Sequence, residues 1–157
     1  MLVAFYPKSR IPDRAKVLEI IGAYTNPEEK KYFNFTDLDH VHWLRAIQEH
    51  RFVLAPFGHG LDTHRISEIY LMGGIPVMRR SSITSCFDDS DNVIWGRGDK
   101  PPLRRGSLPS VIVDRWEDLS QELLEREWAR LRLIPNEEWD WHRILLSQWV
   151  ERIRAGN

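Results

Sequence analysis

The chain has 157 residues, 42% of them hydrophobic and 29% charged, a composition that fits one globular domain and excludes a disordered or fibrous protein. Its 22 basic and 23 acidic side chains leave a formal net charge of -1, so no overall charge attracts it to nucleic acid or to an anionic membrane, and any anion site must be local. No run approaches the roughly 20 apolar residues of a transmembrane helix, and the single cysteine, Cys86, excludes an internal disulfide.

The first third of the chain is predicted to form two strands and two helices. Apolar runs predict short strands over residues 2–6 and 31–35, and helical spacing of apolar residues predicts a helix over 10–24. Thr36, followed three residues later by Asp39, has the spacing of a helix cap. The helix that it opens is expected to turn three apolar side chains inward: Val41, Leu44 and Ile47.

The middle of the chain predicts a strand, a helix and a second strand of the kind found in parallel sheets. Apolar strands are expected over residues 51–55 and 75–78, joined by a glycine-containing loop over 56–62 and a helix over 63–72. The segment 85–110 has few apolar residues, and its length predicts a loop insertion or a functional flap.

The last third of the chain predicts a strand over residues 111–114 and a helix over 118–133. A carboxy-terminal helix is predicted over 137–155 from residues at four-residue steps: Trp141, Leu145, Trp149 and Ile153. The alternation of strands and helices predicts a single α/β domain over residues 1–157, with a doubly wound, mostly parallel, Rossmann-like sheet and helices on both faces. Ligands of such sheets bind at the carboxyl ends of the strands.

The loop after the strand over 51–55 is therefore the first candidate binding site. Gly58 and Gly60 remove side chains where a ligand would approach the backbone. Asp62 or Thr63 can cap the next helix, whose amino terminus favours a phosphate. A capped turn of any α/β protein has the same residues, so that interpretation stays open beside the functional one.

Charged residues near this loop extend the candidate site. Arg65 and Glu68 lie three apart on the predicted helix, so both can point toward one cleft. Arg65 is suited to a diphosphate and Glu68 to the hydroxyls of a ribose or sugar, and an ion pair between the two is the alternative interpretation. Arg79 and Arg80, at the end of the next strand, can close over the same phosphates or form an exposed turn.

This part of the chain resembles a known family. The segment Phe52-Val-Leu-Ala-Pro-Phe-Gly-His-Gly-Leu-Asp-Thr-His-Arg65, followed by Glu68 and Gly73-Gly-Ile-Pro-Val77, is similar to the carboxy-terminal domain of exostosin-like glycosyltransferases. The likeness continues over Leu108-Pro-Ser-Val-Ile-Val-Asp-Arg-Trp-Glu117, so it covers residues 51–128 well and the first fifty more loosely.

The resemblance implies a glycosyltransferase-B fold, with this chain as the half that binds the nucleotide-sugar donor. It also implies that Gly58 and Gly60 line the donor phosphate loop, and that Arg65 and Glu68 meet the diphosphate and the ribose or sugar. The predicted donor-binding residues add two neighbours: Asp62, a possible helix cap, and His59, which can donate to a phosphate or sugar or face solvent. The family commonly has Ser-Pro-Pro-Gly-Asn-Gly where this chain has residues 55–60, so His59 stands in the place of an asparagine. The resemblance identifies no catalytic residue.

The expected function is transfer of a sugar from a nucleoside diphosphate, a UDP-sugar by analogy with the family, to a glycan or another hydroxyl acceptor. No metal and no cofactor beyond that substrate are predicted, although Asp89 and Asp91 have the spacing of a metal-binding pair that a solvated acidic turn would share.

The acceptor half is expected in another part of a longer protein or in a partner chain. The alternative is a non-catalytic nucleotide or sugar-phosphate binding module or interaction subunit, and a purely structural domain would bind no ligand. The expected compartment is the cytoplasm for the chain as it stands, and the Golgi lumen if it is a piece of a longer eukaryotic member of the family.

Overall fold

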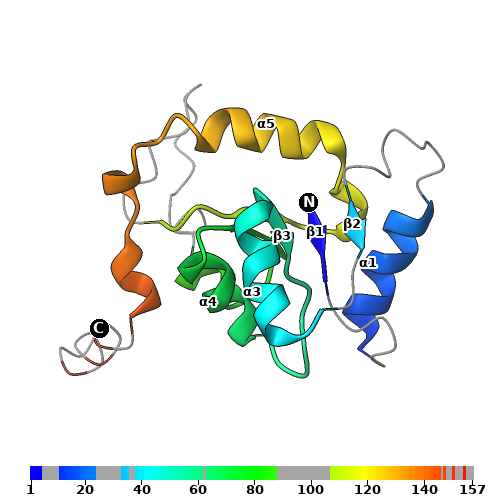
Figure 1. Cartoon of the computed structure of the whole chain (residues 1–157), viewed down its shortest axis with the longest axis horizontal. Helices are drawn as coiled ribbons and strands as arrows, with labels where there is room; N and C mark the ends of the chain where they lie inside the picture. Colours follow the sequence, from blue (N-terminus) through cyan, green and yellow to red (C-terminus); the bar gives the residue numbers. More distant parts are fainter. Residues whose placement is uncertain are drawn as a thin grey trace.

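The structure is a computed structural model of the chain, and it describes residues 1–4, 11–23, 33–35, 38–61, 63–87 and 107–145, with residues 147, 150 and 154 in isolation. Within the described residues, parallel strands form one five-stranded sheet (Figure 1). The strands lie side by side in the order β2-β1-β3-β4-β5. In chain order they are β1 (Leu2–Val3), β2 (Asn34–Phe35), β3 (Phe52–Leu54), β4 (Ile75–Arg79) and β5 (Val111–Val113).

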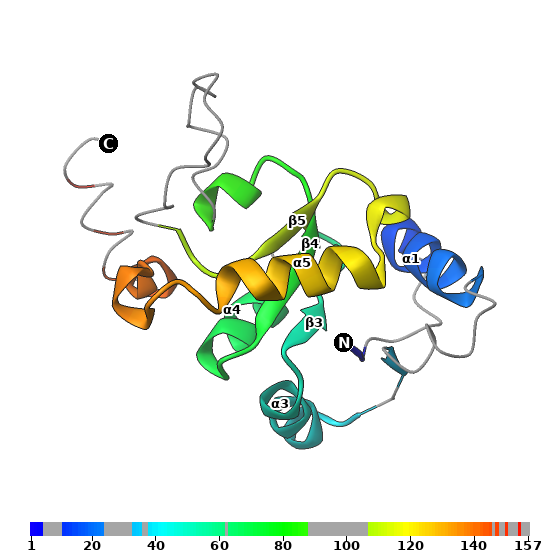
Figure 2. The same ribbon diagram turned by 90° about the horizontal axis from the view of Figure 1, so that it is seen from above.

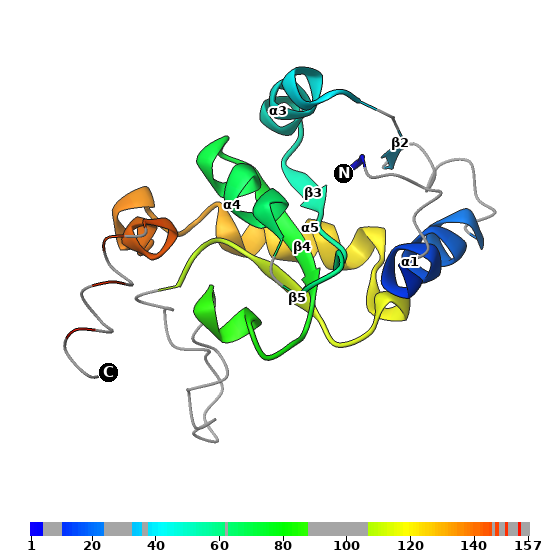
Figure 3. The same ribbon diagram turned by 90° about the horizontal axis from the view of Figure 1, so that it is seen from below.

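Helices cover both faces of this sheet. One face packs against α1 (Pro12–Ala23) and α5 (Gln121–Leu131), and the other against α3 (His40–Glu49) and α4 (His64–Leu71). Seen from above, α5 runs across the strands, and seen from below it lies behind them (Figures 2 and 3). No helix of the described residues has the length and apolar character needed to cross a membrane.

The alternation of side chains along each strand builds two separate cores. Leu54 and Val77 point to the face covered by α1 and α5, whereas Val53 and Met78 point to the face covered by α3 and α4. Successive side chains of a strand point to opposite faces, so a strand that is apolar throughout must be covered on both. The predicted doubly wound, Rossmann-like α/β fold is confirmed.

The start and the buried side of α3 differ from the prediction. Asp39 is its N-cap, because the Asp39 carboxylate accepts a hydrogen bond from the backbone N–H of His42 at 3.0 Å. Thr36, the predicted cap, lies outside the described residues. The buried side chains are Trp43 and Ile47, four apart. Val41 lies about 200° around the helix from Trp43 and is 58% exposed, so the prediction that it points inward is wrong.

The carboxy-terminal region does not begin as the predicted helix over 137–155. Up to residue 145 it forms two 3-10 turns, Asn136–Glu138 and Trp141–Ile144, with Trp139 between them in an extended conformation. The described residues 147, 150 and 154, further along, are helical. Trp139 packs into the core of the α1 and α5 face. Arg143 is buried and donates hydrogen bonds to the carbonyls of Ser85 and Cys86. These tertiary contacts replace the regular hydrogen bonds of a helix.

Two other predicted segments are described only in part. Residues 88–106, most of the predicted loop insertion, lie outside the described residues, as does most of the predicted carboxy-terminal helix beyond residue 145. The strand predicted over 75–78 and the helix predicted over 63–72 are present within one residue of the predicted bounds, as β4 and α4.

Candidate functional site

A cleft of about 610 Å³ opens where the strands end. Its walls come from the start of α1, the loop after β3, the last residue of β4 and the segment after β5. The residues that line it are Ile11, Pro12, Asp13, Lys16, Phe57, Gly58, His59, Gly60, Leu61, Arg79, Asp114, Arg115, Trp116 and Glu117. The chain continues from β1 to β2 through α1 on one face and from β3 to β4 through α4 on the other. This is the switch point at which doubly wound sheets bind their ligands.

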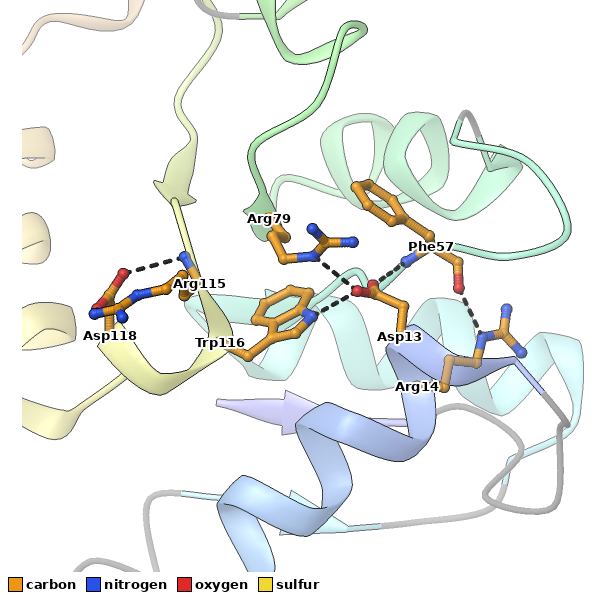
Figure 4. A network of polar contacts seen from close by, with 7 residues as sticks. All are labelled: Asp13, Arg14, Phe57, Arg79, Arg115, Trp116 and Asp118. Carbon is orange, nitrogen blue, oxygen red and sulfur yellow. Dashed lines mark hydrogen bonds and ion pairs between the residues drawn. The ribbon is translucent and has the colours of Figure 1, made fainter.

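Asp13, in the first turn of α1, joins three walls of the cleft (Figure 4). Its Oδ1 accepts hydrogen bonds from Trp116 Nε1 at 2.9 Å and from Arg79 Nε at 2.8 Å, and its Oδ2 accepts one from the Phe57 N–H at 2.9 Å. The side chain is only 9% exposed. A carboxylate at the start of a helix also interacts favourably with the helix dipole.

The loop after β3 lies at the cleft, as the sequence suggested, but part of its backbone is already bonded. The Phe57 N–H donates to Asp13, and the Gly58 N–H donates to the Gly60 carbonyl at 3.1 Å. A Cβ atom on Gly58 would lie 3.0 Å from Thr63 Cγ2, so close packing accounts for this glycine. His59 and Gly60 are exposed at the cleft.

Arg65 and Glu68 lie on the other face of the sheet and do not line this cleft. Arg65 donates from Nη1 to the Ala4 carbonyl at the end of β1, and its guanidinium lies 4.7 Å from the centre of the Trp43 ring. Glu68 accepts a hydrogen bond from Trp43 Nε1 at 2.8 Å and pairs with His40 Nε2 at 3.0 Å. The structure thus brings Gly58, His59 and Gly60 together at the cleft, and Arg65 and Glu68 are not among the residues that line it.

The remaining predicted donor residue, Asp62, lies outside the described residues. Thr63 holds the N-cap position of α4, but its side chain makes no capping hydrogen bond. The helix amino terminus on which the predicted phosphate site depends is present, without a capping hydrogen bond from the Thr63 side chain.

The charges of Arg65 and Glu68 are set by their surroundings. Burial lowers the pKa of the Arg65 guanidinium, Arg14 lowers it further, and Glu68 opposes the change. Burial alone would raise the pKa of Glu68, but the hydrogen bonds from Trp43 and His40 outweigh it and hold that pKa below its usual value. The contacts of these two residues join α4 to Trp43 and His40 of α3 and to the Ala4 carbonyl.

Arg79 and Arg80 have different environments. Arg79 follows the alternation of Ile75 and Val77 toward the face of α1, where it meets Asp13 and stacks on Phe57, with 4.7 Å between its guanidinium carbon and the ring centre. Arg80 pairs instead with Asp114, from Nε to Oδ1, at 2.6 Å. The sequence suggested that this basic pair lies either at the phosphate site or in an exposed turn. Of the two residues, Arg79 lines the cleft and Arg80 does not.

Sequence reasoning missed Asp13 and Trp116 as residues of the site. They are 103 positions apart, and no local pattern connects them. An aspartate directly after Pro12 at a helix start was the available signal, and it indicates a helix cap rather than a cleft residue. The described residues contain no group of three His, Cys, Asp or Glu side chains able to hold a metal, and Asp89 and Asp91 lie outside them.

Comparison with known proteins assigns the chain to no family, because no family model matches it and no curated protein does. A function must therefore be argued from the residues and from the cleft.

Proposed function

We propose that this chain binds a nucleoside diphosphate sugar in the cleft and serves as the donor-binding domain of a metal-independent, exostosin-like glycosyltransferase. One observation carries the proposal. The loop Phe57–Leu61 belongs to the segment that resembles the donor-binding domain of that family, and it forms a wall of the cleft at the switch point of a Rossmann-like sheet.

The size and the lining of the cleft support a ligand of this class. Its volume of about 610 Å³ falls within the range of about 300 to 1,000 Å³ that is typical of small-molecule sites. Phe57 and Leu61 offer apolar surface, which suits a base or a sugar. Three basic side chains that suit a diphosphate line the cleft together with three carboxylates: Lys16, Arg79 and Arg115, and Asp13, Asp114 and Glu117.

A non-catalytic nucleotide or sugar-phosphate binding module is the second candidate, and the state of Asp13 favours it. Asp13 is the most buried carboxylate of the cleft, at 9% exposure against 72% for Asp114 and 49% for Glu117. Its oxygens accept three hydrogen bonds from within the chain. A carboxylate held in this way is poorly placed to take a proton from an acceptor hydroxyl.

Calorimetric titration of the chain with uridine, guanosine and adenosine diphosphates tests the proposal. We expect saturable binding that prefers one base and needs no magnesium. Two variants with the same bulky side chain locate the site. His59→Trp fills the cleft and should abolish binding, whereas Leu71→Trp, at a position 65% exposed on α4, should leave it unchanged.

Absence of saturable binding at about 1 mM ligand, or equal binding by the two tryptophan variants, would contradict the proposal. An assay for donor hydrolysis or sugar transfer then separates the two candidates. Turnover favours the transferase, and binding without turnover favours the non-catalytic module.

A further inference from the structure

We propose that Arg79 is the residue of the cleft that binds the diphosphate, with Asp13 and Phe57 holding its guanidinium in position. This inference rests on the proposed function and makes it more specific, because it names the side chain that meets the phosphoryl groups. It replaces Arg65, which the resemblance implies for that contact and which does not line the cleft.

The loop after β3 has two backbone N–H groups that are not available to a ligand. A loop that cradles a phosphate does so with backbone N–H groups that point at the ligand. Here the Phe57 N–H is bonded to Asp13 and the Gly58 N–H to the Gly60 carbonyl. Two successive amides are thus occupied within the chain, which reduces the number of backbone donors that the loop can offer to a diphosphate and makes the side-chain donors of the cleft more important.

The lysine and arginine side chains that line the cleft, Lys16, Arg79 and Arg115, differ in their partners and in their exposure to water. Lys16 lies 3.3 Å from the Glu117 carboxylate, and Arg115 lies 3.1 Å from the Asp118 carboxylate. Both are more exposed than Arg79, with side chains 48% and 74% exposed against 37%. Exposed cations paired with carboxylates are screened by water and salt, so they contribute less to a specific anion site.

Arg79 has the geometry that the other two lack. Only its Nε faces Asp13, and its guanidinium stacks on the Phe57 ring (Figure 4). Among the residues that the structure describes, its two terminal nitrogens have no hydrogen-bond partner. A planar guanidinium presents paired donors that match two phosphoryl oxygens, and fixing it beforehand reduces the entropy lost on binding.

The Asp13 carboxylate offsets part of the positive charge of Arg79. Binding must therefore depend on the direction of the paired N–H donors more than on charge alone. This predicts that lysine, a point charge without the planar fork, is a poor substitute at this position.

The strand provides a matched control at the next residue. Arg80 has the same side chain and an exposure of 41%, close to the 37% of Arg79, but it pairs with Asp114 instead of Asp13 and does not line the cleft. Arg79→Gln and Arg80→Gln make the same change of charge at adjacent positions. Arg65→Gln tests the competing assignment.

The experiment measures the affinity of the wild-type chain and these three variants for inorganic pyrophosphate and for uridine diphosphate by calorimetry, with thermal unfolding of each. We expect Arg79→Gln to weaken both ligands by at least about tenfold, the loss expected for hydrogen bonds to a charged group. Arg80→Gln and Arg65→Gln should change the affinities by no more than about twofold. If Arg79→Gln does not fold, Arg79→Lys replaces it, with a loss of similar size expected.

Two of the possible outcomes distinguish failure of this inference from failure of the proposed function. Uridine diphosphate binding that is insensitive to Arg79, or lost only in Arg65→Gln, would overturn the inference and leave the function standing. Pyrophosphate binding that requires Arg79, without any binding of the nucleotide, would support the anion site and overturn the proposed function. If the wild-type chain binds neither ligand, both are wrong.

Discussion

At the level of single residues, Asp13 determines how the walls of the cleft meet. Its carboxylate accepts hydrogen bonds from an indole, a guanidinium and a backbone amide that come from three other segments of the chain. A buried acceptor with several donors is costly to replace, because each donor left without a partner has already lost its water.

Asp13→Asn is therefore expected to lower the free energy of unfolding by about 2 to 3 kcal/mol. The asparagine amide places N–H groups against the donors of Trp116 or Arg79. The loss is smaller than that for a fully buried ion pair because the Arg79 side chain is partly exposed to water. Urea denaturation with fitted m-values measures the change.

The control for Asp13→Asn is Asp114→Asn, which removes a 72% exposed carboxylate that also pairs with an arginine. Its effect should stay within about 0.5 kcal/mol. Equal losses in the free energy of unfolding for the two variants would show that the three hydrogen bonds of Asp13 contribute no more to stability than the exposed ion pair of Asp114 does.

Neither Asp13 nor Arg79 could be assigned to a shared site from the sequence. They are 66 positions apart, and their contact depends on which face of β4 is turned toward α1. The alternation of side chains along β4 predicts that Arg79 and Arg80 point to opposite faces of the sheet. Which of the two lies at the cleft can be predicted only once it is known which helices cover which face. Gly58 was found because it belongs to a loop whose position follows from local pattern alone.

At the level of elements, the contact between α3 and α4 depends on a glycine. A Cβ atom on Gly74 would lie 2.9 Å from Ile47 Cγ2 and 3.1 Å from Ile69 Cγ2, and both isoleucines are fully buried. Gly22, in α1, has open space around it. Apart from the helix backbone and the two neighbouring residues in the chain, no atom of the described residues lies within 4 Å of the place that a Cβ atom would take there.

The same substitution should accordingly have opposite effects at the two positions. Gly74→Ala crowds a packed core and is expected to destabilise the chain by about 1 to 3 kcal/mol. Gly22→Ala should stabilise it by up to about 1 kcal/mol, because alanine loses less backbone entropy in a helix. Thermal unfolding of both variants checks the signs, and a loss of stability in both would contradict the packing argument.

The elements that were predicted well are those whose cause is local. Continuous apolar runs predict β3, β4 and β5, since a strand buried on both faces needs no polar alternation. The predicted helix over 137–155 is absent over residues 137–145 for the opposite reason, whereas the described residues 147, 150 and 154 are helical. Trp141 and Leu145 have helical spacing, but the tertiary contacts of Trp139 and Arg143 determine the backbone conformation here. A four-residue spacing of apolar side chains does not predict such contacts.

At the level of the whole molecule, the doubly wound topology explains where the cleft lies. The chain leaves β1 and β3 on opposite faces, and four segments that are distant in sequence meet at the ends of the strands. The position of the candidate site could therefore be predicted from the order of strands and helices. Its chemistry could not, because Arg65 and Glu68 face α3 and β1 while Asp13 and Arg79 face the cleft.

The response of the whole chain to acid follows from its carboxylates. Hydrogen bonds from the backbone and the ring of His42 lower the pKa of Asp39, and a backbone hydrogen bond and Lys16 lower that of Glu117. The pKa of Glu68 is also lowered, since its hydrogen bonds to Trp43 and His40 outweigh its burial. In each case the unfolded chain takes up protons at a higher pH than the folded chain does.

The stability that these groups provide is thus fully present above the ordinary carboxylate pKa values of about 4 and is lost as the pH falls through the lower, folded values. Glu68 is the most buried of the three, and the groups that face it are His40 and Trp43 on α3 and His64 and Arg65 on α4. Glu68→Gln should lower stability at pH 7 and make the free energy of unfolding depend less on pH between about 5 and 2. Glu137→Gln, which removes an exposed carboxylate, should follow the wild-type curve, and parallel curves for all three proteins would show that Glu68 does not contribute to acid unfolding.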